Sequence, residues 1–135
     1  MTLNQLFEKF QTQYGCCLDI DDFSSVLVMY PASLVALADG EFSQLERENI
    51  INALKESASG NDFKTCEMYR MLCKILELPS DDKVALLKSM NEEIADRPEI
   101  KKIILELMIS TAESDNGISK EEKTAIDLLK NILSL

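Results

Sequence analysis

The chain has 135 residues, with 24 acidic against 14 basic side chains and a formal net charge of −10. This length suffices for one hydrophobic core, so we expect a single domain over residues 1–135. An acidic surface repels phosphate backbones and anionic membranes, which argues against nucleic acid and direct membrane insertion. It favours cations or basic protein surfaces as partners, although solubility alone would also explain the charge.

The composition indicates helices. Hydrophobic residues make up 46% of the chain, but aromatic residues only 6%, and tryptophan is absent. Leu, Ile, Met and Ala must therefore fill the core, and they suit helices better than sheets. The 4 Gly and 3 Pro are too few for the turns of an all-β chain. We predict an all-α fold, a single-domain bundle of about seven helices.

The first two predicted helices are bounded by clear signals. The first begins at Leu3, after a capping box formed by Thr2 and Gln5, and stops at Gly15. The second opens at Asp21 or Asp22. Its apolar residues keep the helical period, but it contains Pro31, which is expected to kink or split it.

Two further helices precede Pro79. The third is capped by Ser43 and ends within residues 57–60, and the fourth is capped by Asp62 and runs to about Leu78. On the fourth helix the stripe expected to face inward is Cys66, Tyr69, Cys73 and Leu76. The same helix carries Met68, Met71 and Leu72, which are either buried or form an apolar partner surface.

Three helices complete the chain. Ser80, followed by two aspartates, starts the fifth, Pro98 lies in the first turn of the sixth, and Ser119 caps the seventh. Residues 100–109 of the sixth helix are nearly all apolar, so we expect this helix to be central.

The chain shows neither a secretory signal nor a run of bilayer length, and we expect a cytoplasmic protein. Its four cysteines do not suit disulfides, because Cys16 and Cys17 are adjacent while Cys66 and Cys73 lie about 10 Å apart along one helix. Buried free thiols in a reducing compartment are expected. The absence of a CxxC pair argues against a zinc knuckle.

A weak internal repeat at an offset of 76 is the most informative feature. Residues 36–54 read ALADGEFSQLERENIINAL and residues 112–129 read AESDNGISKEEKTAIDLL. Asp39 aligns with Asp115 and Glu46 with Glu122, and each copy opens an amphipathic helix. One interpretation is purely structural, because both copies contain an S-x-x-E capping box and a Gly or Asn that ends the preceding helix.

The functional interpretation is an acidic cation site. Each loop half-matches a calcium-binding loop, with Asp39 or Asp115 at its fifth position and Glu46 or Glu122 at its twelfth. Neither loop is complete by itself, but two adjacent loops could pool Asp39, Glu41, Glu46, Asp115 and Glu122. Clustered carboxylates repel one another, and a hard cation or a basic partner would relieve that repulsion.

The paired (A/S)D(G/N)-x-apolar-S-x-x-E loops, the seven helices and the chain length resemble the TerB-like, tellurite-resistance-associated domains. The resemblance implies an all-α fold from a duplicated unit, and a metal-binding or scaffold role in bacterial stress responses. Similar domains accompany J-domains in co-chaperones. By position, the implied metal site is Asp39, Glu41 and Glu46 with Asp115 and Glu122. The second copy has Asn116-Gly117 where the first has Gly-Glu, so it lacks a counterpart of Glu41.

Histidine is absent, which removes the commonest general base and all imidazole metal ligands. We therefore expect no enzyme activity, and a divalent cation with oxygen ligands, Ca²⁺ or Mg²⁺, as the only cofactor. The preferred hypothesis is a non-catalytic module whose acidic loops bind a cation, a basic partner, or both. The alternative is a protein–protein adaptor, a co-chaperone-like scaffold that uses an apolar helical face, with the loops serving only as helix caps.

Overall fold

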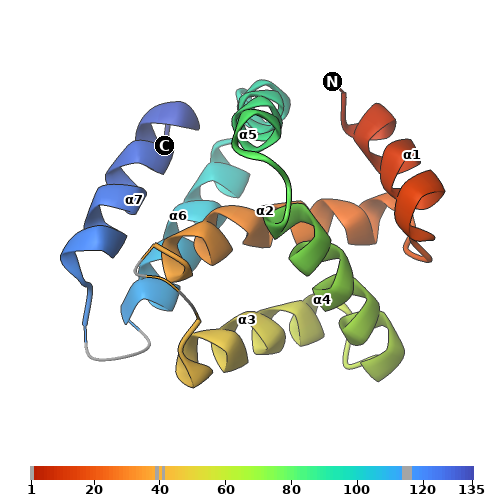
Figure 1. Cartoon of the computed structure of the whole chain (residues 1–135), viewed down its shortest axis with the longest axis horizontal. Coiled ribbons are helices and arrows are strands. Elements are labelled where there is room, and N and C mark those ends of the chain that lie inside the picture. The colour runs from red at the N-terminus through yellow and green to blue at the C-terminus, as the bar shows by residue number, and fades with distance from the viewer. Residues whose placement is uncertain (1, 39, 41, 114–116) are drawn as a thin grey trace.

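The computed structural model describes residues 2–38, 40, 42–113 and 117–135. These residues form seven α-helices and no strand, so the predicted all-α fold is confirmed (Figure 1). In chain order the helices are α1 (Leu3–Tyr14), α2 (Ile20–Ala36), α3 (Gln44–Ser57), α4 (Asp62–Leu76), α5 (Ser80–Ile94), α6 (Pro98–Glu113) and α7 (Lys120–Ile132).

Helix α2 lies at the centre of the molecule and packs against α1, α3, α4, α6 and α7 (Figure 1). Residues 29–33 of α2 are all buried, so the helix is covered on every side over this stretch. The prediction that the sixth helix is central was therefore wrong. Helix α6 packs along α2 but stays amphipathic, with Ile103 and Ile109 exposed to solvent. A helix that is apolar all round is the one that must be buried, and here that helix is α2.

Pro31 does not split α2, which is uninterrupted from Ile20 to Ala36. A proline inside a helix costs about 3 kcal/mol, because its ring clashes with the preceding turn and one backbone hydrogen bond is lost. Burial of one large apolar side chain contributes roughly 1.5–3 kcal/mol. Helix α2 buries several, among them Phe23, Leu27 and Met29, so packing outweighs the cost of the proline.

Two predicted helix starts are shifted. The cap of α2 is Asp19 rather than Asp21 or Asp22, and its carboxylate accepts a hydrogen bond from the amide of Asp22 at 2.8 Å. The cap of α4 is Asn61 rather than Asp62. In both helices the predicted cap residue lies in the first turn instead, where its negative charge is favourable at the positive end of the helix.

Helix α4 presents a different face to the core from the predicted stripe. Its buried residues are Thr65, Met68, Met71, Leu72 and Ile75. Cys66, predicted to face inward, is exposed, and Cys73 is only partly buried. All four cysteines are free as predicted, but only Cys16 is buried. Burial raises the pKa of the Cys16 thiol above its usual value, which lowers its reactivity.

In the part of the chain that the structure describes, no helix is long and apolar enough to cross a membrane.

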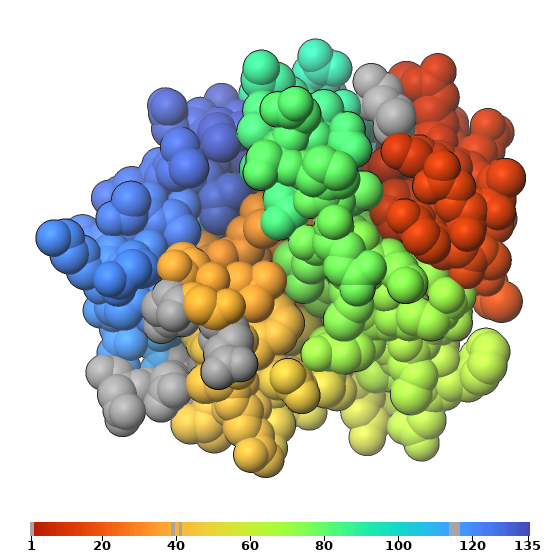
Figure 2. Space-filling model, in the orientation of Figure 1, coloured from red at the N-terminus to blue at the C-terminus, as the bar shows by residue number. Residues whose placement is uncertain are grey.

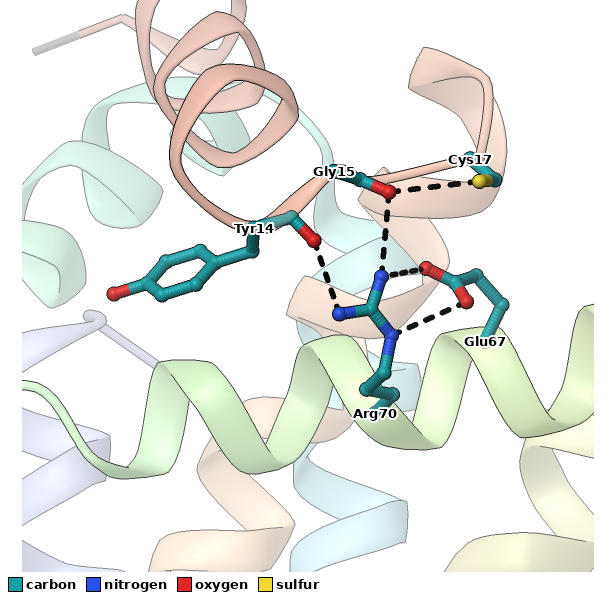
Figure 3. Close-up of polar contacts among 5 residues, drawn as sticks. All are labelled: Tyr14, Gly15, Cys17, Glu67 and Arg70. Atoms are coloured by element: carbon teal, nitrogen blue, oxygen red, sulfur yellow. Dashed lines mark hydrogen bonds and ion pairs between the residues drawn. The ribbon is translucent and has the colours of Figure 1, made fainter.

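Arg70 anchors the end of α1 to α4 (Figure 3). Helix α1 ends at Gly15, which adopts a left-handed conformation with φ of 61°. The last carbonyls of a helix have no partner within the helix. The Arg70 guanidinium, which also pairs with Glu67, donates to two such carbonyls, that of Tyr14 at 3.0 Å and that of Gly15 at 3.3 Å.

We predict that Arg70→Met lowers the free energy of unfolding by about 1–2 kcal/mol, because both carbonyls lose a charged donor. Urea denaturation measures this as a lower midpoint with an unchanged slope. Arg47→Met is the matched control, since Arg47 is exposed and its side chain makes no ion pair among the described residues. Equal midpoints for the two variants would contradict the anchoring role.

Candidate functional site

Helices α3 and α7 begin with the same reciprocal capping box. At the start of α3 the Ser43 hydroxyl accepts from the amide of Glu46 at 3.1 Å, and the Ser43 amide donates to Glu46 Oε1 at 2.8 Å. At the start of α7 the corresponding distances between Ser119 and Glu122 are 3.1 and 2.9 Å. The predicted caps of both repeat copies are thus confirmed.

The two capping glutamates are buried, with exposed fractions of 4% for Glu46 and 3% for Glu122. Glutamate is almost never this buried unless it is paired. Each cap uses only one carboxyl oxygen, Oε1. The other oxygen of Glu122, Oε2, is buried and accepts no hydrogen bond within the described residues. The capping function therefore leaves a buried acceptor oxygen available.

The carboxyl groups of Glu46 and Glu122 lie close together, although one belongs to each repeat copy. Helices α3 and α7 begin on the same side of the molecule (Figure 1). The pKa of Glu46 is raised chiefly by burial, and the nearby Glu122 carboxyl raises it further, against the opposing effect of the hydrogen bond from the Ser43 amide. The structure thus brings the equivalent acids of the repeat into one location.

This arrangement is electrostatically costly. Two carboxylates in a poorly solvated site repel each other, and burial disfavours the charged form of Glu46. The positive ends of α3 and α7 offset part of this cost, because each glutamate lies in the first turn of its helix. A proton shared by the pair, or a cation bound to it, would offset the rest. The chemistry that the site supports is therefore uptake of a small positive charge.

The remaining predicted ligands, Asp39, Glu41 and Asp115, lie outside the described residues. Within the described ranges no group of three or more His, Cys, Asp or Glu side chains is placed to hold a metal ion. The complete five-residue ligand set therefore stays a prediction.

One polar contact near the site is not predictable from the sequence. The side-chain amide of Asn49, on α3, donates to the hydroxyl of Thr111, on α6, at 3.1 Å. Asn49 follows Glu46 by three positions, and Thr111 is fully buried. This hydrogen bond joins the first turns of α3 to the end of α6, close to the loop that leads into α7. No local signal identifies it, because the two residues are far apart in sequence.

The family model of the tellurite resistance protein TerB matches residues 25–135. The chain belongs to the TerB family. No curated protein and no solved structure matches it significantly. The TerB match begins inside α2 and contains both repeat loops, so Glu46 and Glu122 lie within the matched region, whereas α1 precedes it. The resemblance proposed from the paired loops is confirmed, and the chain is a TerB module, of a family named for tellurite resistance.

We predict that Glu46→Gln stabilises the metal-free protein by about 1 kcal/mol at about pH 7.5, since an amide can donate to the Glu122 carboxylate instead of repelling it. Below the ordinary pKa of 4.5 both folded and unfolded states carry the proton, and burial of the charge costs nothing. Above the raised pKa of Glu46 in the folded state, the carboxylate is charged and the full cost of burying that charge lowers the stability. Wild-type stability therefore declines as pH rises through this interval, and the variant lacks that decline.

Urea denaturation in EDTA at about pH 4 and about pH 7.5 measures the effect. Glu121→Gln is the control, because Glu121 lies in the same first turn of α7 as Glu122 but is exposed. If Glu46→Gln were less stable than the wild type at the higher pH, the repulsive pair would be disproved.

Proposed function

We propose that the chain is a non-catalytic module of the tellurite-resistance type whose acidic site binds a divalent cation, Ca²⁺ or Mg²⁺. The observation that supports this most directly is the pair formed by Glu46 and Glu122. Both are buried, they lie close together, and Glu122 Oε2 accepts no hydrogen bond within the described residues. An unpartnered buried carboxylate oxygen is unfavourable, and a bound cation would satisfy it.

The chemistry of the ligands favours hard cations. All oxygen atoms of the predicted set come from carboxylates, and the chain contains no histidine. Glu46 and Glu122 would each offer a single oxygen, because Oε1 already accepts the cap hydrogen bond. Either ion needs six or more oxygens. The others would come from water or from the predicted ligands Asp39, Glu41 and Asp115.

The burial of the pair favours a small ion over a basic protein segment. With only 4% and 3% of Glu46 and Glu122 exposed, the carboxylates are too buried for an arginine or lysine head group to reach them. The adaptor alternative loses one of its surfaces, since Met68, Met71 and Leu72 are buried in the core rather than presented to a partner. Cation binding is therefore the better supported of the two hypotheses.

We predict that millimolar Ca²⁺ or Mg²⁺ raises the thermal midpoint relative to EDTA. A ligand that binds only the folded state stabilises it by RT ln(1 + [L]/Kd), about 2.7 kcal/mol at a hundredfold excess over Kd. Glu46→Gln combined with Glu122→Gln is expected to abolish the shift. Differential scanning calorimetry with and without each ion provides the measurement.

The matched control is Glu48→Gln combined with Glu121→Gln, which removes the same charge from exposed positions on the same two helices. This control is expected to keep the full shift. An identical shift in both double variants would mean that the ions act on the general surface charge, and no shift in the wild type would exclude the cation site.

A further inference from the structure

A second candidate binding site lies on a different part of the molecule, between α1 and α5. These two helices are in contact and are adjacent on the face shown in Figure 2. A pocket of about 190 Å³ opens between them, with parts of α2 and α6 among its lining. Its interior is mostly aliphatic and includes Leu6, Leu27, Val28, Leu86, Ile100 and Ile104. Glu46 and Glu122 do not line it, so it is separate from the acidic pair.

The size of the pocket limits what can occupy it. An apolar cavity of about 150 Å³ is large enough for benzene, and this pocket is slightly larger. An α-helix is about 10–12 Å across with its side chains, so a partner helix cannot enter between α1 and α5. The volume therefore fits the hydrocarbon part of a small molecule, about six to eight carbons by comparison with benzene.

The charged groups at the pocket indicate the head group of that molecule. Among the described residues, four charged side chains line it: Lys9, Asp82, Glu93 and Arg97. Lys9 is partly buried, whereas Asp82, Glu93 and Arg97 are exposed. A partly buried lysine packs its aliphatic stem against apolar surface and keeps its ammonium at the edge, so the Lys9 charge lies at the rim of the pocket. None of these four side chains forms an ion pair within the described residues, and Lys9 is the least exposed of them. An unpaired cation beside an apolar pocket complements an anionic head on an apolar tail.

We propose that this pocket binds a short aliphatic carboxylate, with the tail among the leucine and isoleucine side chains and the carboxylate paired with Lys9. The proposal does not depend on cation binding at the acidic site. It assigns the pocket a ligand of one chemical class, and the test separates the contribution of the tail from that of the head group.

The test is a titration of the ¹⁵N-labelled full chain, in EDTA, with octanoate, octanol and octylamine, followed by ¹H–¹⁵N correlation spectra. We expect octanoate to bind saturably, with shifts concentrated on α1 and α5, octanol to bind more weakly and octylamine more weakly still. Lys9→Gln is expected to weaken octanoate at least about threefold and leave octanol unchanged. Lys88→Gln, on α5 but outside the pocket, is the charge-matched control.

A second pair of variants tests the location. Ala85 lines the pocket from an exposed position, so Ala85→Phe should fill it and abolish octanoate binding. Val84→Phe places the same ring on the adjacent exposed residue, which does not line the pocket, and should bind as the wild type does. Ser89→Leu fills the same space should Ala85→Phe fail to fold.

Three results would overturn the proposal. The first is non-saturable binding of octanoate to the wild type. The second is octylamine binding as tightly as octanoate, which would remove the role of Lys9. The third is undiminished binding to the folded pocket-filling variant, which would place the ligand elsewhere.

Discussion

The burial of α2 is the constraint on which the rest of the structure depends. Over residues 26–36 this helix is apolar on nearly every side, and such a helix is stable only when neighbours cover it all round. Helices α1, α3, α4, α6 and α7 supply that cover. Helices α3 and α7 both pack on α2 and begin on the same side of the molecule, which brings their N-termini toward each other (Figure 1). The proximity of Glu46 and Glu122 thus follows from the packing of the core.

The sequence predicts the features of this fold that have local causes. Capping boxes need only a serine or threonine and an acid or amide three positions later, so all three were identified correctly. The buried face of α4 was not identified correctly, because two neighbouring stripes of this helix are both apolar. Cys66 and Leu76 lie on one, and Met68 and Leu72 lie on the other. Only the position of α2 decides between them, and that is a tertiary property.

The pairing of Glu46 with Glu122 was predictable from the sequence, but the physical state of this pair was not. The repeat aligns Glu46 with Glu122, and this pair does meet in space. Neither the burial of the pair nor the lack of a partner for Glu122 Oε2 among the described residues could be inferred, because both depend on side chains remote in sequence. A glutamate that caps a helix can also be a candidate cation ligand, so these two interpretations do not exclude each other. A carboxylate has two oxygens, and the capping box uses one of them. The same glutamate can therefore cap the helix N-terminus and still offer its other oxygen to an ion.

The pocket and the acidic pair have different structural origins. Both repeat loops lie within residues 25–135, so the duplicated unit is contained in the TerB region. One wall of the pocket is α1, which precedes that region and is tied to α4 by Arg70. Membership of the family therefore bears on the acidic pair but not on the complete pocket. By linkage, the proposed pocket ligand would stabilise the docking of α1, whereas the proposed cation would stabilise the convergence of α3 and α7. The two proposed binding sites thus share one core but involve different helices.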